Sequence, residues 1–185
     1  MTTTVFIGGS RFVSRLPAEV KLRLDNIVES GHRVVVGDAN GADKAAQRHL
    51  HDAGYEQVVV FCSGQNCRNN LGAWKVRNVS AYPKTKGYQF YAAKDREMAK
   101  EADFGLMIWD GSSVGTVLNV LRLMQSDKIS VLFNVPVKQS INIKSRGDWD
   151  EFISRCDAAL IESLRERATI AERGTLHRDG LPALA

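Results

Sequence analysis

Phe104 to Leu121, FGLMIWDGSSVGTVLNVL, is the stretch that decides the fold. Its apolar run, Phe104 to Trp109, has the length of a buried parallel strand. A loop of glycine and serine follows, Asp110 to Thr116, and then apolar residues at helical spacing, Val117 to Met124. A strand, a small loop and a helix start offer free backbone N–H groups and a helix dipole to an anion. The same pattern is typical of a tight turn whose glycines only allow the backbone to bend. The loop alone does not distinguish an anion-binding site from such a turn.

The rest of the chain alternates between strands and helices. The predicted further strands are residues 3–7, 33–36, 57–61 and 130–133, with additional candidates at 74–79 and 140–143. Amphipathic segments lie between most of them. This alternation predicts a doubly wound, Rossmann-like α/β fold, in which helices cover both faces of a mainly parallel sheet.

The predicted organisation is a Rossmann-like domain over residues 1–145 and a helical extension over 146–185. Apolar residues recur at helical spacing between Trp149 and Leu164, which indicates at least one amphipathic helix. No periodicity follows Gly174, so the end of the chain is expected to be loose.

Four predicted strands end in small polar or charged sequences. They are GGSR from Gly8, GDANGAD from Gly37, CSGQNCRNN from Cys62 and WDGSSVGT from Trp109. In parallel sheets ligands bind at the carboxyl ends of strands, near the switch in strand order. The opposite pole carries plain helix ends such as residues 29–32. This asymmetry favours a ligand site over simple turns.

The composition is that of an ordinary globular protein and excludes several classes. The chain has 185 residues, a net charge of +4 and no apolar run near the ~20 residues of a membrane span. Neither a signal peptide nor a Lys/Arg run is present, so we expect a cytoplasmic protein for which nucleic acid is an unlikely partner. Three cysteines do not indicate a disulfide framework, and Cys62 and Cys67 lack further ligands for a metal. No metal and no cofactor is expected.

Glycines, hydroxyls and basic residues of these loops are candidates for binding phosphate. They are Gly8, Gly9, Ser10, Arg11, Gly111, Ser112, Ser113, Gly115 and Thr116, with Arg68 from the long loop after the third strand. Ser112 or Ser113 is equally a good helix cap. Arg11 is equally a solvated surface residue.

Carboxylates at the strand ends are candidates for catalysis. Asp110 directly follows the central strand and Asp38 follows the second, so either could supply negative charge for N-glycosidic chemistry. The alternative for Asp110 is a turn residue that bonds its own backbone. Asp43 lies in a first helical turn, where the dipole favours a carboxylate whether or not it binds a ligand. The aromatic rings of residues 88–91 suit either a stacked base or the core.

Taken together, GGSR, VVVGDANGADKAA and ADFGLMIWDGSSVGTVLNVL resemble the SLOG superfamily, a Rossmann-like group that includes the Lonely-guy phosphoribohydrolases and the DNA-processing protein DprA. The Gly37-Asp38-x-x-Gly41-Ala42-Asp43 signature is most similar to the YpsA-like branch. The resemblance covers about residues 3 to 136 and implies a nucleotide or nucleotide-derived ligand at the glycine loops, which adds Gly37, Gly41 and Asp43 to the candidate binding residues.

The resemblance also bears on activity. Lonely-guy enzymes carry a PGGxGTxxE motif with a catalytic glutamate, and the matching stretch here, Trp109 to Asn119, is two residues longer and places Asn119 at the glutamate. Lys94 matches a helix arginine of those enzymes. Two functions therefore stand open: a nucleotide-binding protein, and a nucleoside-monophosphate N-glycosidase with displaced carboxylates. A DprA-like role on single-stranded DNA is a weaker third. Homo-oligomers are common for such folds, and the apolar face of residues 148–164 could form the interface or equally cover the sheet edge of its own chain.

Overall fold

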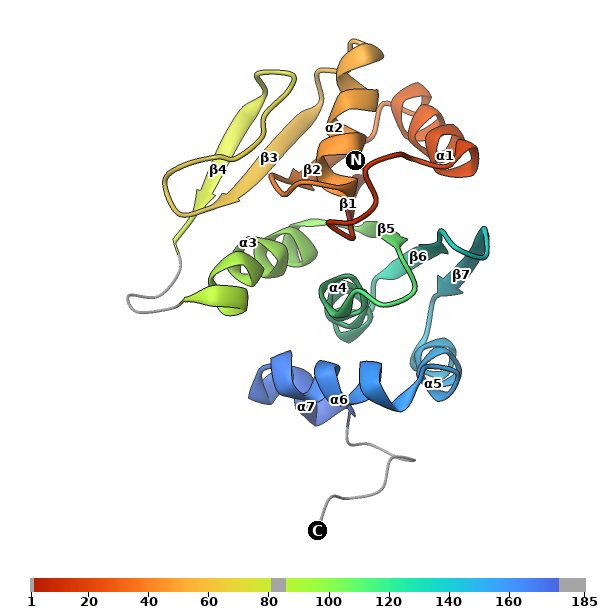
Figure 1. The fold of residues 1–185 in the computed structure, drawn as a ribbon. Helices are drawn as coiled ribbons and strands as arrows, with labels where there is room; N and C mark the ends of the chain where they lie inside the picture. The colour runs from red at the N-terminus through yellow and green to blue at the C-terminus, as the bar shows by residue number, and fades with distance from the viewer. Residues whose placement is uncertain (1, 81–85, 177–185) are drawn as a thin grey trace.

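Seven strands form one sheet in the order β4-β3-β2-β1-β5-β6-β7 (Figure 1). The computed structural model describes residues 2–80 and 86–176. The strands are β1 (Thr4–Gly9), β2 (Arg33–Gly37), β3 (Val58–Ser63), β4 (Lys75–Val79), β5 (Phe104–Trp109), β6 (Ile129–Asn134) and β7 (Gln139–Ile143). Every neighbouring pair is parallel except β6 and β7. The predicted Rossmann-like α/β fold is confirmed.

Helices cover both faces of this sheet, as Figure 1 shows. They are α1 (Ala18–Glu29), α2 (Ala42–Asp52), α3 (Gly87–Glu101), α4 (Val114–Gln125), α5 (Arg146–Ser154), α6 (Ala158–Arg167) and α7 (Ile170–Leu176). The first two pack on one face, and α3 and α4 pack on the other. The three C-terminal helices, blue in Figure 1, lie beyond α4 and contact it.

The central strands are apolar on both sides because both sides are covered. Along β1, Val5 and Ile7 join the core under α1 and α2, and Phe6 joins the core under α3 and α4. β5 divides in the same way, with Ile108 on the first side and Trp109 on the second. A sheet held in this way is a rigid support for the loops that leave its ends.

Several boundaries differ from the sequence prediction. The third strand, predicted at 57–61, runs from Val58 to Ser63. The short candidate strands at 74–79 and 140–143 are both present, as β4 and β7. The C-terminal periodicity is divided between α5 and α6, because Asp157 caps a new helix by accepting a hydrogen bond from the N–H of Leu160 at 2.7 Å. The expected loose end lies almost wholly at 177–185, outside the described residues.

The switch in strand order falls between β1 and β5. After β1 the chain builds β2, β3 and β4 outward on one side, and then returns to place β5 against the other edge of β1. In the register, Gly8 lies beside Met107 and Gly9 beside Ile108. The loops after β1 and β5 therefore start side by side, which is where this class of sheet holds its ligands.

Within residues 2–80 and 86–176, no helix has the length and apolar character needed to cross a membrane.

Candidate functional site

A cavity of about 460 Å³ opens at the switch point, between the loops after β1 and β5 and the helices α3 and α4. Ten of the predicted binding residues line it: Gly8, Gly9, Ser10, Arg11, Asp43, Arg68, Lys94, Ser113, Gly115 and Thr116. They come from five separate segments of the chain. The expectation that the strand ends converge on one cavity thus agrees with the geometry.

The loop after β5 leaves backbone donors free at the cavity. Asp110 accepts from the N–H groups of Ser112 (3.0 Å) and Ser113 (2.7 Å), so those two donors are used within the turn. The next three, on Val114, Gly115 and Thr116, begin α4, and a helix cannot pair its first N–H groups internally. In the part of the chain that the structure describes, no acceptor faces these three.

Thr116 adds a side-chain donor to the same place. Thr116 lines the cavity and is only 3% exposed, and its buried hydroxyl has no hydrogen-bond partner among the described residues. Buried hydroxyls are normally paired, because leaving one unpaired costs about 1–3 kcal/mol. An unpaired hydroxyl beside three free N–H groups indicates a place for a hydrogen-bonding ligand.

The loop after β1 is different, because the backbone N–H, the carbonyl and the hydroxyl of Ser10 all bond the protein. The N–H of Ser10 donates to the Ile108 carbonyl at 2.9 Å, and its own carbonyl accepts from Ala42 at 2.9 Å. The Ser10 hydroxyl donates to Asp110 at 2.6 Å and accepts from the N–H of Phe12 at 3.1 Å. This loop offers a ligand the side chains of Arg11 and Phe12, of which Phe12 is 83% exposed.

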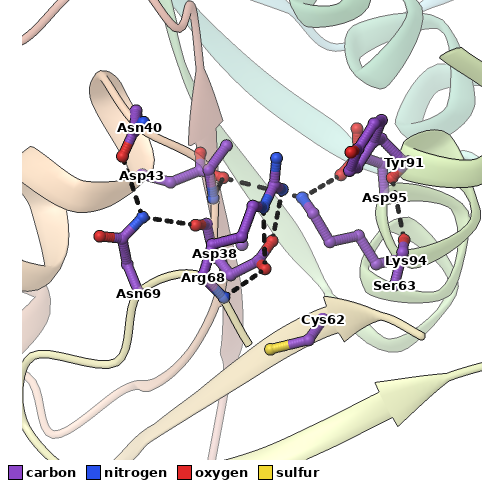
Figure 2. Close-up of polar contacts among 12 residues, drawn as sticks. Asp38, Asn40, Asp43, Cys62, Ser63, Arg68, Asn69, Tyr91, Lys94 and Asp95 are labelled. Carbon is purple, nitrogen blue, oxygen red and sulfur yellow. Dashed lines mark hydrogen bonds and ion pairs between the residues drawn. The ribbon is translucent and has the colours of Figure 1, made fainter. Parts of the chain in front are cut away.

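Two buried charges, Lys94 and Asp43, and the half-buried Asp95 line one wall of the cavity (Figure 2). The Lys94 ammonium lies 2.7 Å from Asp95 and 3.7 Å from Asp43. Burial raises the pKa of Asp43 to about 6, although Lys94 opposes this rise. Burial would lower the pKa of Lys94, but Asp95 and Asp43 hold it above its ordinary value. Lys94 therefore stays charged, while Asp43 is placed to exchange a proton near neutral pH.

Asp38 acts on the cavity through Arg68. The Arg68 guanidinium donates to Asp38 at 2.6 and 3.0 Å, and the Arg68 backbone N–H donates to the same carboxylate at 3.0 Å. Burial opposes ionisation of Asp38, yet these bonds hold its pKa below its ordinary value. Figure 2 shows this pair. The Arg68 guanidinium also lies over the ring of Tyr91, 4.6 Å from the ring centroid. Asp38 thus holds the loop that carries Arg68 to the cavity.

The two carboxylates predicted as catalytic do not line the cavity. Asp38 bonds Arg68, and Asp110 bonds Ser10, Ser112 and Ser113, which is the turn role weighed for it from sequence. The other predicted residues outside the lining are Gly37, Gly41, Gly111 and Ser112. The glycines at 37 and 41 allow close packing: a Cβ at Gly37 would overlap Asp43 and Lys94, and one at Gly41 would overlap the backbone of Arg11.

Some lining residues were not predicted. Asp95 lies four residues after Tyr91 on α3, and Asn119 lies three residues after Thr116 on α4, so helical spacing would have indicated both. Arg167 comes from the C-terminal extension and lies over the ring of Tyr88 at 5.3 Å. Nothing in its local sequence marks it. Tyr88 and Tyr91 line the cavity, while Phe90 packs against Tyr91.

The cysteine prediction needs correction, because Cys62 and Cys67 form a disulfide. The odd number of cysteines argued against a disulfide, but the turn after β3 brings these two together and leaves Cys156 as the free one. The ligand atoms of these cysteines and Asp38 lie within 4.8 Å of one another. With both sulfurs in the disulfide and the carboxylate on Arg68, this cluster offers no free ligand set for a metal.

Comparison with known proteins supports the fold alone. No protein-family model matches the chain, and no curated protein matches it. The structure is similar to the molybdenum cofactor binding protein of Rippkaea orientalis, with 13% identity and a TM-score of 0.56 over 83% of this chain and 84% of that one. It is also similar to DNA processing protein A of Helicobacter pylori (16%, 0.54, 90% and 74%) and of Streptococcus pneumoniae (15%, 0.55, 88% and 61%). All three likenesses place this protein in the Rossmann-like α/β class.

Proposed function

We propose that this protein binds a nucleotide or a nucleotide-derived ligand, with a phosphate group at the start of α4. The observation that carries the proposal is the set of free donors there: three backbone N–H groups and the buried, unpaired hydroxyl of Thr116. A helix N-terminus with free N–H groups favours an anion through both hydrogen bonds and the dipole.

The remainder of the cavity suits the remainder of a nucleotide. Arg11, Arg68 and Arg167 line it and supply positive charge, and Tyr88, Tyr91 and Phe12 supply aromatic faces. A phosphate uses the charge, and a base or sugar covers the rings. The structural neighbours are described as binding a molybdenum cofactor or single-stranded DNA, which is consistent with this class of ligand. The SLOG-like motifs point the same way, and we propose a cytoplasmic member of that superfamily.

The test is isothermal titration with inorganic phosphate, nucleoside mono- and diphosphates, dinucleotides and cyclic nucleotides. We expect binding by at least one phosphate compound. The panel includes a single-stranded oligonucleotide, whose affinity would fall steeply with salt if DNA were the ligand. If no compound in the panel binds, the proposal is wrong.

A matched pair of variants locates the phosphate. Val114→Pro removes one N–H at the first helical position, where proline is tolerated, and Ser113 before it has the extended ψ of 109° that proline needs. Val114→Ala also loses side-chain packing but keeps the N–H. We expect Val114→Pro to weaken binding about tenfold or more, and Val114→Ala to leave it nearly unchanged. Equal affinities in the two variants would remove the phosphate from this helix end.

A second candidate function is hydrolysis of an N-glycosidic bond in a nucleotide. It is favoured by one observation: Asp43, with a pKa of about 6, lines the same cavity as the free donors. In this reaction the C1′–N bond breaks, water adds to C1′, and the base leaves with a proton, which an acid such as Asp43 could supply. Released base, lost in Asp43→Asn and retained in Asp110→Asn, would support it. No release from any common nucleotide would contradict it.

A further inference from the structure

We propose that Asn119 reads a hydrogen-bond acceptor on the ligand, and that Arg122 and Glu172 fix which end of its amide faces the cavity. The inference rests on the proposed function, because it concerns the same cavity. It adds a specificity-determining residue on α4 and a positioning pair that links this helix to α7.

The orientation of the Asn119 amide follows from its partner. Asn119 is 5% exposed and lines the cavity, and its Oδ1 accepts a hydrogen bond from Nη1 of Arg122 at 2.6 Å. A guanidinium has donors and no acceptor, so the oxygen of the amide is the only end that can face it. The NH₂ end then faces the cavity. No acceptor for it is present among residues 2–80 and 86–176.

Arg122 is itself held in place from the C-terminal extension. Its Nε donates to Oε1 of Glu172 at 2.7 Å, and both side chains are buried. The second oxygen of Glu172 accepts from the N–H of Thr169 at 2.7 Å, so the carboxylate also caps the start of α7. Burial opposes ionisation of Glu172, but Arg122 keeps its pKa below its ordinary value. Neither member of the pair lines the cavity, so both act on a ligand through the lining residues that Arg122 contacts, Asn119 by a hydrogen bond and Tyr88 by its charge.

The spacing on α4 defines the kind of ligand. Thr116 and Asn119 are three residues apart and so lie on one face of the helix. A phosphate at the helix start would place its oxygens on Val114 to Thr116, and the Asn119 donor lies about 5 Å deeper, one helical turn along. The ligand would therefore carry an acceptor about that far from its phosphate. In a nucleotide, the ring oxygen and the hydroxyls of the sugar lie in this range.

The experiment is a nuclear magnetic resonance titration of the ¹⁵N-labelled full chain with two probes, inorganic phosphate and ribose 5-phosphate. The side-chain NH₂ signal of Asn119 is assigned in the unmodified protein, from a ¹³C,¹⁵N-labelled sample, through its bonds to the Asn119 carbonyl carbon and Cβ. We expect both probes to shift the backbone N–H signals of residues 114–116. Only ribose 5-phosphate should also shift the Asn119 NH₂ signal.

The variants separate reading from positioning. Asn119→Asp keeps an oxygen for Arg122 but loses the donor, and should weaken ribose 5-phosphate binding about tenfold more than it weakens phosphate binding. Arg122→Met frees the amide to turn and should weaken ribose 5-phosphate binding several-fold. Arg122→Lys, which still donates to Oδ1, should restore most of that loss. Equal losses in Arg122→Met and Arg122→Lys would overturn the positioning role.

The two proposals fail in different ways. If ribose 5-phosphate shifts residues 114–116 but leaves the Asn119 NH₂ signal unmoved, Asn119 does not read the ligand and the phosphate site stands. If neither probe shifts residues 114–116, the phosphate site is wrong and the role of Asn119 falls with it. These signals come from the unmodified protein, so they decide the question even where a variant does not fold.

Discussion

Two glycine loops border the same cavity, and they use their polar groups in opposite ways. The loop after β1, Gly8 to Arg11, bonds Ile108, Ala42 and Asp110 through Ser10. The loop after β5, which runs into α4, bonds Asp110 at its first two N–H groups and leaves the next three free. The first loop is held by the protein, and the second is open to a ligand.

This difference separates two uses of glycine. A Cβ on Gly9 would overlap the Ile108 carbonyl oxygen and lie 2.8 Å from the Ala42 side chain, so glycine there allows β1, β5 and α2 to approach closely. A Cβ on Gly115 would meet only Tyr88, at 3.7 Å. Glycine at 115 is therefore not required for close packing, and it leaves the space at the start of α4 open.

The largest expected effect is on stability. Gly9→Ala should lower the free energy of unfolding by about 3 kcal/mol, because the new methyl group meets backbone on a rigid strand. The matched Gly115→Ala should leave it unchanged or raise it by up to about 1 kcal/mol, since alanine favours the helix. Urea denaturation measures both. Equal destabilisation of the two variants would contradict the division between a packed loop and an open one.

The carboxylates near the two loops should respond to pH with opposite signs. Asp43 has a pKa of about 6 in the folded protein against an ordinary value of 3.8, so the folded state binds its proton more tightly than the unfolded state does. The stability that Asp43 contributes is therefore present below about pH 4 and is lost as the pH rises through 6. The free energy of unfolding of the wild type, relative to Asp43→Asn, should fall by up to about 3 kcal/mol between pH 4 and 7.

Asp110 supplies the contrast. Burial raises its pKa, but hydrogen bonds from Ser10, Ser112 and Ser113 bring it below the ordinary value. Its contribution is present at neutral pH and is lost as the pH falls below about 4. The free energy of unfolding of the wild type, relative to that of Asp110→Asn, should therefore fall as the pH is lowered. If the difference in the free energy of unfolding between the wild type and Asp43→Asn did not change with pH, the raised pKa of Asp43 would be refuted.

The next effect tests the bonds that close the first loop. Ser10→Ala removes a donor to Asp110 and the acceptor for the N–H of Phe12, both at a buried residue. We expect a loss of about 1–2 kcal/mol in the free energy of unfolding, because a half-buried carboxylate and a backbone N–H each lose a partner. The affinity for phosphate should stay within about twofold. A large loss of affinity in a folded Ser10→Ala protein would mean that this loop contacts the phosphate directly.

Sequence reasoning reached the fold because the signals for it are local and repeated. Buried parallel strands such as β5 have continuous apolar runs, and their alternation with amphipathic helices determines the sheet and its switch point. The candidate site was predicted in outline for the same reason. Boundaries such as the division between α5 and α6 depend on a single capping side chain, Asp157, that the periodicity does not reveal.

The details of the site depended on contacts between distant residues. Asp38 and Asp110 look alike in sequence to Asp43, since each follows a strand or opens a helix. Hydrogen bonds to distant residues decide which of them faces the cavity. Arg68 donates to Asp38, and Ser10 donates to Asp110, which is 100 positions away in the sequence. The buried bond between Arg122 and Glu172 spans 50 positions and is likewise invisible to local patterns. Glycine loops show where a ligand can approach, and only the hydrogen bonds show which loop has donors left.

The smallest expected effect sharpens that last point. Thr116→Val replaces the unpaired hydroxyl with a methyl group of nearly the same shape, so it removes no bond within the described protein. The free energy of unfolding should stay constant or rise by up to about 1 kcal/mol, because a buried polar group without a partner is lost. The affinity for a phosphate compound should nevertheless fall about tenfold, as measured by titration. A more stable protein that binds more weakly is the expected result for a hydroxyl kept for a ligand, and Ser10→Ala should show the reverse. If Thr116→Val is instead destabilised and binds as before, its hydroxyl serves the fold, and the open loop is no more a binding loop than the closed one.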